Sequence, residues 1–160
     1  MKSLLLVIDL QKSFINENTK YLIDRINNLV NSSMYDYVIF TKFINKINSI
    51  WVKKLNYMGC LSDEDREIDL DTKDKMIFEK DVYTAYSKKL VDYIKSNNID
   101  VIYLCGIDTE CCVLKTAFDL FENGYDVKVL RDYSASIHGM ESNNYILDVI
   151  GRSIGRDNVI

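Results

Sequence analysis

One stretch joins a predicted strand to a predicted helix and decides the fold: Val101-Ile102-Tyr103-Leu104-Cys105-Gly106-Ile107-Asp108-Thr109-Glu110-Cys111-Cys112-Val113-Leu114. Its first five residues form an apolar run typical of a buried parallel strand, and 113–122 has the amphipathic pattern of a helix. A cysteine at such a junction faces a helix N-terminus, where unpaired N–H groups and the positive end of the dipole favour thiolate over thiol. Because thiolate is the nucleophilic form, Cys112 is a candidate nucleophile.

The rest of the chain repeats this alternation of strand and helix. We expect strands at 3–9, 37–41, 75–78, 100–105 and 126–130, with a short last strand at 158–160. We expect helices at 19–30, around 49–55, and at 87–97, 112–123 and 142–150, and we interpret the acidic segment 60–74 as a surface loop. The pattern predicts one α/β domain, residues 1–160, built as a three-layer αβα sandwich with a mostly parallel, about six-stranded Rossmann-like sheet.

Composition and charge exclude several classes of function. The net charge is −4 with Lys and Arg scattered, which argues against nucleic-acid binding. The N-terminal apolar run is too short for a signal peptide and ends at Asp9, and no run approaches membrane-spanning length. The four cysteines have no metal-type spacing. We therefore expect a cytoplasmic protein with reduced thiols and no nucleic-acid or membrane partner.

Three reactive residue types fall just past the ends of predicted strands. Asp9 ends the first strand, Lys80 follows the third, and the 106–112 loop follows the fourth. These ends share one rim of a parallel sheet, where ligands bind in open α/β folds. A lysine ammonium favours thiolate, and a carboxylate can take the thiol proton and return it to a leaving amine. Backbone N–H groups near Asp108 and Cys112 are candidates for stabilising an oxyanion, so the pattern predicts acyl transfer at a C–N bond.

Three motifs carry a resemblance to a known family. Asp9-Leu10-Gln11-Lys12-Ser13-Phe14 looks like D-x-Q-x-x-F, and Lys80-Asp81-Val82-Tyr83-Thr84-Ala85-Tyr86 looks like K-x-x-[YF]-[ST]-A-F. Gly106-Ile107-Asp108-Thr109-Glu110-Cys111-Cys112-Val113 looks like G-x-x-T-[DE]-x-C-V. In this order and at these spacings, the chain resembles the isochorismatase-like cysteine hydrolases, which include nicotinamidases, N-carbamoylsarcosine amidases and ureidoacrylate hydrolases.

The resemblance implies a role for each matching residue. Asp9 would be the general base, Lys80 the orienting cation and Cys112 the nucleophile, with a small molecule as substrate and no cofactor. The resemblance also implies a cis peptide at Ile107–Asp108, oxyanion-hole amides at Asp108 and Cys112, and pocket-side aromatic rings at Phe14 and Tyr83. Because the family commonly forms dimers or tetramers, we expect a homo-oligomer.

Two departures from the family pattern bear on the substrate. Nicotinamidases resemble one another in an Asp–His–His metal site after the second strand, where this chain has Asn45 and Asn48. Two amides without a carboxylate make a poor transition-metal site, so we predict no metal. The middle segment, 43–74, is short for the family and normally helps to form the pocket, which leaves specificity open.

Several residues near the predicted rim have more than one interpretation. His138, the only histidine, is interpreted as a partly exposed loop residue, with substrate contact as the alternative. Cys111 is expected to point away from the pocket into packing if Cys112 points into it. Trp51, Phe43 and Tyr86 could wall the pocket or pack in the core or at a subunit interface.

The leading hypothesis is a cysteine-dependent amidohydrolase that cleaves a small amide or ureido compound through a Cys112 thioester. One alternative is an isochorismatase-type vinyl-ether hydrolase, whose chemistry does not need the thiol. Another is a non-catalytic binding or assembly subunit, which the short middle segment would fit. A flavodoxin-like binder is disfavoured because Asp9-Leu10-Gln11-Lys12 offers no phosphate-cradling loop.

Overall fold

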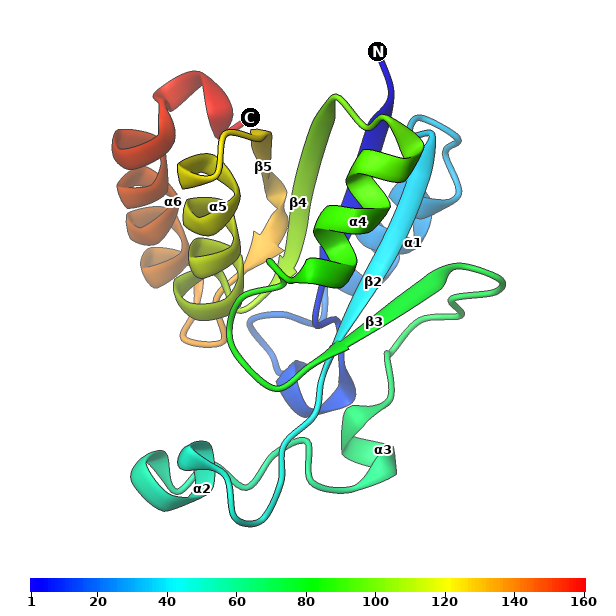
Figure 1. The fold of residues 1–160 in the computed structure, drawn as a ribbon. Coiled ribbons are helices and arrows are strands. Elements are labelled where there is room, and N and C mark those ends of the chain that lie inside the picture. Colours follow the sequence, from blue (N-terminus) through cyan, green and yellow to red (C-terminus); the bar gives the residue numbers. More distant parts are fainter.

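Five parallel strands form one sheet in the computed structural model, which describes residues 1–160. Their order is β3-β2-β1-β4-β5, so β1 lies in the centre (Figure 1). The strands are β1 (Ser3–Ile8), β2 (Tyr37–Phe43), β3 (Met76–Lys80), β4 (Val101–Ile107) and β5 (Asp126–Ala135). The α-helices are α1 (Leu22–Val30), α2 (Ile50–Leu55), α3 (Asp63–Arg66), α4 (Lys88–Asn97), α5 (Leu114–Glu122) and α6 (Met140–Ile154). Short turns of other helix types are η1 (Lys12–Phe14), η2 (Thr109–Val113) and η3 (Arg156–Asn158).

Strand β1 is buried on both faces, which explains its continuously apolar sequence. Leu4, Leu6 and Ile8 face one hydrophobic core, and Leu5 and Val7 face another on the opposite side of the sheet, all fully buried. Helices α4, α5 and α6 cover the first side and α1 covers the second (Figure 1). A strand buried on both faces needs apolar side chains at every position. The predicted three-layer α/β sandwich is confirmed.

The sheet has five strands, so the prediction of a sixth at 158–160 is wrong. Gly155 leaves α6 with a positive φ of 104°, and the chain then makes the η3 turn. Only Val159 remains in position to pair, through an isolated parallel bridge to Val129 on β5. One paired residue does not make a strand.

Other elements differ from the predictions mainly at their ends. The acidic segment 60–74 contains the short helix α3, whose first turn is capped by the Ser62 hydroxyl. Ile68 in the same segment is buried and bridges to Gln11, which ties the segment to the sheet rim. Strand β5 continues to Ala135, beyond the charged pair at 131–132, because those two side chains are exposed.

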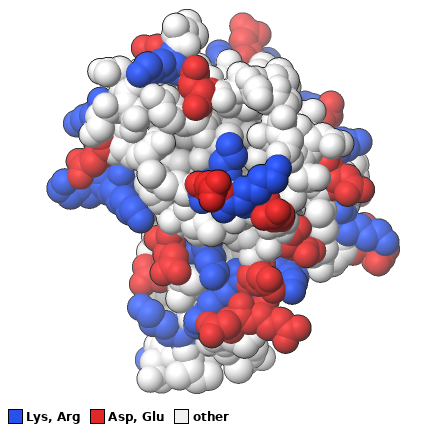
Figure 2. All heavy atoms as spheres, turned by 90° about the vertical axis from the view of Figure 1, so that its right-hand side faces the viewer, with Lys and Arg blue, Asp and Glu red and all other residues white.

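Charged side chains of both signs lie on the face of the molecule drawn in Figure 2. Figure 2 shows acidic and basic side chains intermixed over one face, without a basic stripe. No helix in the structure has the length and apolar character needed to cross a bilayer.

Candidate active site

The carboxyl ends of β1, β3 and β4 bring Asp9, Lys80 and Cys112 together. The Lys80 ammonium lies 2.6 Å from Asp9 Oδ2 and 3.6 Å from Cys112 Sγ. Asp9 is fully buried, and the Cys112 residue is 6% exposed. Parallel strands place their carboxyl ends on one rim, which is how three residues far apart in sequence meet. The structure thus provides an ammonium in contact with both a carboxylate and a thiol.

Asp9 is held by the neighbouring strand. Its backbone N–H donates to Thr41 Oγ1 at 3.1 Å, and the same hydroxyl donates to Asp9 Oδ1 at 2.6 Å. Asp9 has a positive φ of 43°, which is uncommon for a residue with a side chain and is maintained only where the surroundings stabilise it. Thr41 and Lys80 therefore fix one carboxylate oxygen each.

Lys80 is locked by contacts on every side. Its Nζ donates to the carbonyl oxygens of Val82 and Tyr83, each at 3.0 Å, as well as facing Asp9 and Cys112. Burial by itself lowers the pKa of this ammonium, but the charge of Asp9 and the contact with Cys112 outweigh burial and leave the pKa raised. The side chain is therefore a fixed positive charge.

Cys112 lies within the π-helical turn η2, immediately before α5. Burial, followed by the charge of Asp9, raises the pKa of its thiol well above the ordinary value, and Lys80 opposes this only in part. The prediction that the helix N-terminus favours thiolate is therefore wrong for the resting site. Desolvation and a neighbouring carboxylate both favour the protonated thiol.

The loop between β4 and η2 requires a glycine and contains the expected cis peptide. A Cβ at Gly106, where φ is +116°, would lie 2.1 Å from the Ile8 carbonyl oxygen, so only glycine allows β1 and β4 to approach. The Ile107–Asp108 peptide is cis. The N–H groups of Cys111 and Val113 both donate to the Asp108 carbonyl oxygen. The amides of Asp108 and Cys112 stay the predicted oxyanion donors.

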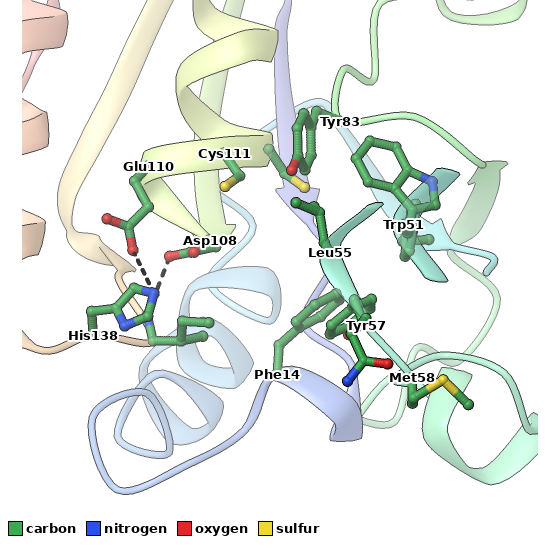
Figure 3. A pocket seen from close by; sticks show the side chains of 14 residues that line it. Phe14, Trp51, Leu55, Tyr57, Met58, Tyr83, Asp108, Glu110, Cys111 and His138 are labelled. Atoms are coloured by element: carbon green, nitrogen blue, oxygen red, sulfur yellow. Dashed lines mark hydrogen bonds and ion pairs between the residues drawn. The ribbon is translucent and has the colours of Figure 1, made fainter. Parts of the chain in front are cut away.

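A cavity of about 490 Å³ opens above Cys112. Phe14 and Tyr83 line it as the motifs predict, and Trp51 and Phe43 line it too, whereas Tyr86 packs near Tyr125 instead. The remaining lining residues are Leu55, Asn56, Tyr57, Met58, Asp108, Glu110, Cys111, Ile137 and His138 (Figure 3). The short middle segment therefore still supplies one whole side of a pocket large enough for a small molecule.

The two remaining ambiguous residues, Cys111 and His138, also line this cavity. Cys111 is half-buried; it packs against the first hydrophobic core, as predicted, and it also lines the pocket beside Cys112, which the prediction did not include. Both cysteines belong to the π-helical turn η2, a type of turn that is frequent at functional sites. His138 has a side chain that is 66% exposed, as expected for a loop histidine, yet it also lines the pocket mouth.

The side chain at the expected metal position is used for structure. Asn45 is buried, donates to the carbonyl oxygens of Tyr57 and Gly59, and accepts from the Lys46 N–H and the Ser49 hydroxyl. No group of three or more His, Cys, Asp or Glu side chains is arranged to hold a metal ion. Asn45 thus shapes the middle segment that forms the pocket.

Some residues of the site carry a weaker signal in the sequence. Thr41 is a polar residue inside an apolar strand, which hints at a specific contact, but nothing in its neighbours names Asp9 as the partner. Gln11 is fully buried, and its amide bonds to both the N–H and the carbonyl of Phe43 and to the Arg66 carbonyl. The first motif identifies Gln11 in the sequence. Only the fold shows that its side chain joins its own segment to those of Phe43 and Arg66.

Comparison with known proteins identifies relatives over nearly the whole chain. The family described as Isochorismatase domain matches residues 3–149. Isochorismatase family protein 2A of Dictyostelium discoideum is 32% identical over 143 residues, covering 86% of this chain and 68% of that protein. Isochorismatase family protein 1A of the same organism is 30% identical, covering 84% of this chain and 63% of that protein. The chain thus spans about two thirds of the length of these relatives.

Solved structures share the fold at lower identity. A pyrazinamidase/nicotinamidase from Streptococcus mutans UA159 superposes with a TM-score of 0.85 at 20% identity, covering 99% of this chain and 100% of that one. An N-carbamoylsarcosine amidase from Thermoplasma acidophilum superposes with a TM-score of 0.80 at 21% identity, covering 94% of each chain.

Proposed function

Since this chain belongs to the isochorismatase family, we propose that it is a cysteine-dependent amidohydrolase that cleaves a C–N bond of a small amide or ureido compound. The observation that carries the proposal is the contact of Lys80 with both Asp9 and Cys112, at 2.6 Å and 3.6 Å, below a cavity lined by Cys112. Structural neighbours named as amidases add support for this class of reaction.

The first half-reaction transfers the acyl group to sulfur. Cys112 Sγ attacks the amide carbonyl carbon while its proton passes to the carboxylate of Asp9, which contacts the same Lys80 ammonium as the sulfur. The carbonyl oxygen becomes an oxyanion that the amides of Asp108 and Cys112 stabilise. The C–N bond then breaks, the leaving nitrogen takes the proton from Asp9, and a Cys112 thioester remains.

The second half-reaction restores the enzyme. A water molecule attacks the thioester carbonyl and gives a proton to Asp9; the C–S bond breaks, and that proton returns to sulfur. The products are a carboxylic acid and an amine or ammonia. Lys80 keeps Asp9 in position and offsets its charge throughout, because its own contacts hold it in one place.

Two features weigh against the other candidate functions. A non-catalytic subunit would have no need for a buried ion pair against a thiol at the base of an open cavity. A vinyl-ether hydrolase acting on isochorismate would have to accept a dicarboxylate, whereas two carboxylates, Asp108 and Glu110, line this cavity.

The test is turnover of a panel of small amides and ureides, measured as ammonia release, with hydroxylamine added to intercept the acyl-enzyme. We expect a hydroxamate product from the wild type and no product of either kind from Cys112→Ala. Lys80→Met should reduce kcat by a factor of a thousand or more. Lys12→Met, which removes a lysine from an exposed ion pair, is the matched control and should keep wild-type kcat.

Equal hydroxamate yield from Cys112→Ala and wild type would exclude a Cys112 thioester. Wild-type kcat in Lys80→Met would exclude the role of that ammonium, because the other contacts of Asp9 would then be sufficient.

A further inference from the structure

The cavity above Cys112 has two unlike walls. Figure 3 shows Trp51 and Tyr83 on one side and Asp108, Glu110 and His138 grouped on the other. The aromatic wall is continuous, since the ring centroids of Trp51 and Tyr83 are 4.5 Å apart. No lysine or arginine is among the lining residues. An apolar wall therefore faces two carboxylates.

Both carboxylates are held in place rather than free in solvent. Asp108 is 7% exposed and its Oδ1 accepts from the Ile137 N–H at 3.2 Å. Glu110 accepts from the Ser136 hydroxyl at 2.9 Å, and its side chain is 23% exposed. Burial and the nearby Glu110 raise the pKa of Asp108 to about 6, so the Asp108 carboxyl is ionised at pH 8.

The protein itself supplies little positive charge to this wall. His138 Nε2 lies 3.5 Å from Glu110 Oε1, but an imidazole offsets a carboxylate only when it is protonated. Lys80, below the cavity, is committed to Asp9. In a partly buried cavity, an uncompensated negative charge interacts strongly with a ligand's charge because solvent screening is reduced.

We infer that this cavity selects amides that carry a cationic group, such as a primary ammonium or an amidinium, on a flat apolar body. The amide carbonyl lies at Cys112, the cation lies against Asp108 and Glu110, and the body packs on the wall of Trp51 and Tyr83. Amides that carry a carboxylate are disfavoured by the same two residues. The inference rests on the proposed hydrolase activity for the reaction. It adds the charge of the substrate group that lies away from the amide.

Three matched probes test the charge preference. They are 4-(aminomethyl)benzamide, 4-methylbenzamide and 4-carbamoylbenzoate, which share a benzamide body and differ in charge. Trp51 is the only tryptophan and lines the cavity, so its fluorescence reports binding. Binding is measured at pH 8 in Cys112→Ala, which removes turnover, and ammonia release is measured in the wild type.

We expect the cationic probe to bind at least tenfold tighter than the neutral probe and the anionic probe to bind most weakly. Glu110→Gln and Asp108→Asn keep the accepting carbonyl for Ser136 and Ile137 and should each reduce the cationic-to-neutral ratio about fivefold. The Kd of the neutral probe shows that the variant pocket is intact. Glu17→Gln, at an exposed ion pair, should leave the ratio unchanged.

Three results would overturn the inference: equal affinity for the three probes, no binding of the cationic probe at millimolar concentration, or a charge ratio unchanged in both carboxylate variants. The proposed reaction is judged separately. Turnover without a charge preference removes only this inference, whereas a charge preference in binding without turnover of any amide removes only the reaction.

Discussion

Replacing Thr41 by valine isolates the contact that positions Asp9. Thr41 is 2% exposed, and its hydroxyl both donates to Asp9 Oδ1 and accepts from the Asp9 N–H, at 2.6 Å and 3.1 Å. Valine has nearly the same shape, so packing is kept while both hydrogen bonds are lost. The Asp9 side chain is buried, so water does not readily replace the hydroxyl.

The expected cost in stability follows from the two groups left without a partner. An unsatisfied buried carboxylate oxygen costs about 2 kcal/mol, and an unsatisfied buried N–H costs about 1 kcal/mol, so Thr41→Val should lower the free energy of unfolding by about 3 kcal/mol. That is a large part of the 5–15 kcal/mol, roughly, that stabilises an ordinary domain. Thr41→Ser keeps the hydroxyl and should cost only about 1 kcal/mol for one methyl group.

Urea denaturation and amide turnover measure the two consequences separately. In Thr41→Val we expect kcat to fall tenfold to a hundredfold with little change in KM, because Asp9 moves protons during bond making and breaking. Thr41→Ser should stay within threefold of wild type. Thr116→Val is the matched control: its buried hydroxyl accepts from the Ala85 N–H, away from Asp9, so stability should fall by about 1 kcal/mol with kcat unchanged.

The reasoning is refuted if the free energy of unfolding of Thr41→Val lies within about 1 kcal/mol of the wild-type value and its kcat is unchanged. It is also refuted if Thr41→Ser loses as much activity as Thr41→Val, because the hydroxyl would then not be the cause.

Two further predictions concern the loop after β4. Gly106→Ala places a Cβ against the Ile8 carbonyl at a φ of +116°, so it should destabilise the fold by more than about 4 kcal/mol, read from urea midpoints or from loss of folded protein. Wild-type stability in this variant would show that β1 and β4 can separate. Asp108→Asn should match wild type in stability at pH 4 and exceed it by up to about 2 kcal/mol at pH 8. Folding raises the pKa of Asp108 from 3.8 to about 6, so the folded state favours the protonated carboxyl. The stability of the wild type therefore falls as pH rises through that interval. The titratable groups that face Asp108 are Glu110, His138, Cys111 and Tyr83. Thermal melts from pH 4 to 8 measure the difference, and a constant difference would contradict the prediction.

The layers of the fold could be predicted because each strand is a short apolar run and the helices alternate with them. Continuous burial of β1 on both faces leaves a signal that needs no knowledge of the partners. The sixth strand could not be judged in the same way. Whether 158–160 pairs depends on how Gly155 and η3 direct the chain after α6, and that path is set by tertiary contacts.

The positions of Asp9, Lys80 and Cys112 at the rim could be predicted from strand ends alone, but their surroundings could not. The orientation of Cys111 depends on the π-helical turn, which has no signature in the sequence. The acidic wall has no separate signal in the sequence, because Asp108 and Glu110 match a motif that does not show where their side chains point. Their meeting with His138 depends on how β5 and the segment after it pack against the loop.

The protonated thiol changes how the reactivity of this site is best judged. A resting thiolate would place two negative charges, on Cys112 and Asp9, against the single ammonium of Lys80 in a buried space, and the raised pKa of Cys112 reflects that cost. In the proposed reaction the proton passes from sulfur to Asp9 as the substrate carbonyl oxygen takes up negative charge. Cys112 and Asp9 are therefore never negatively charged at the same time. Alkylation by iodoacetamide requires the thiolate, which the raised pKa of Cys112 disfavours, so labelling should be slow at neutral pH even in an active enzyme. Turnover therefore tests the nucleophile more directly than thiol labelling does.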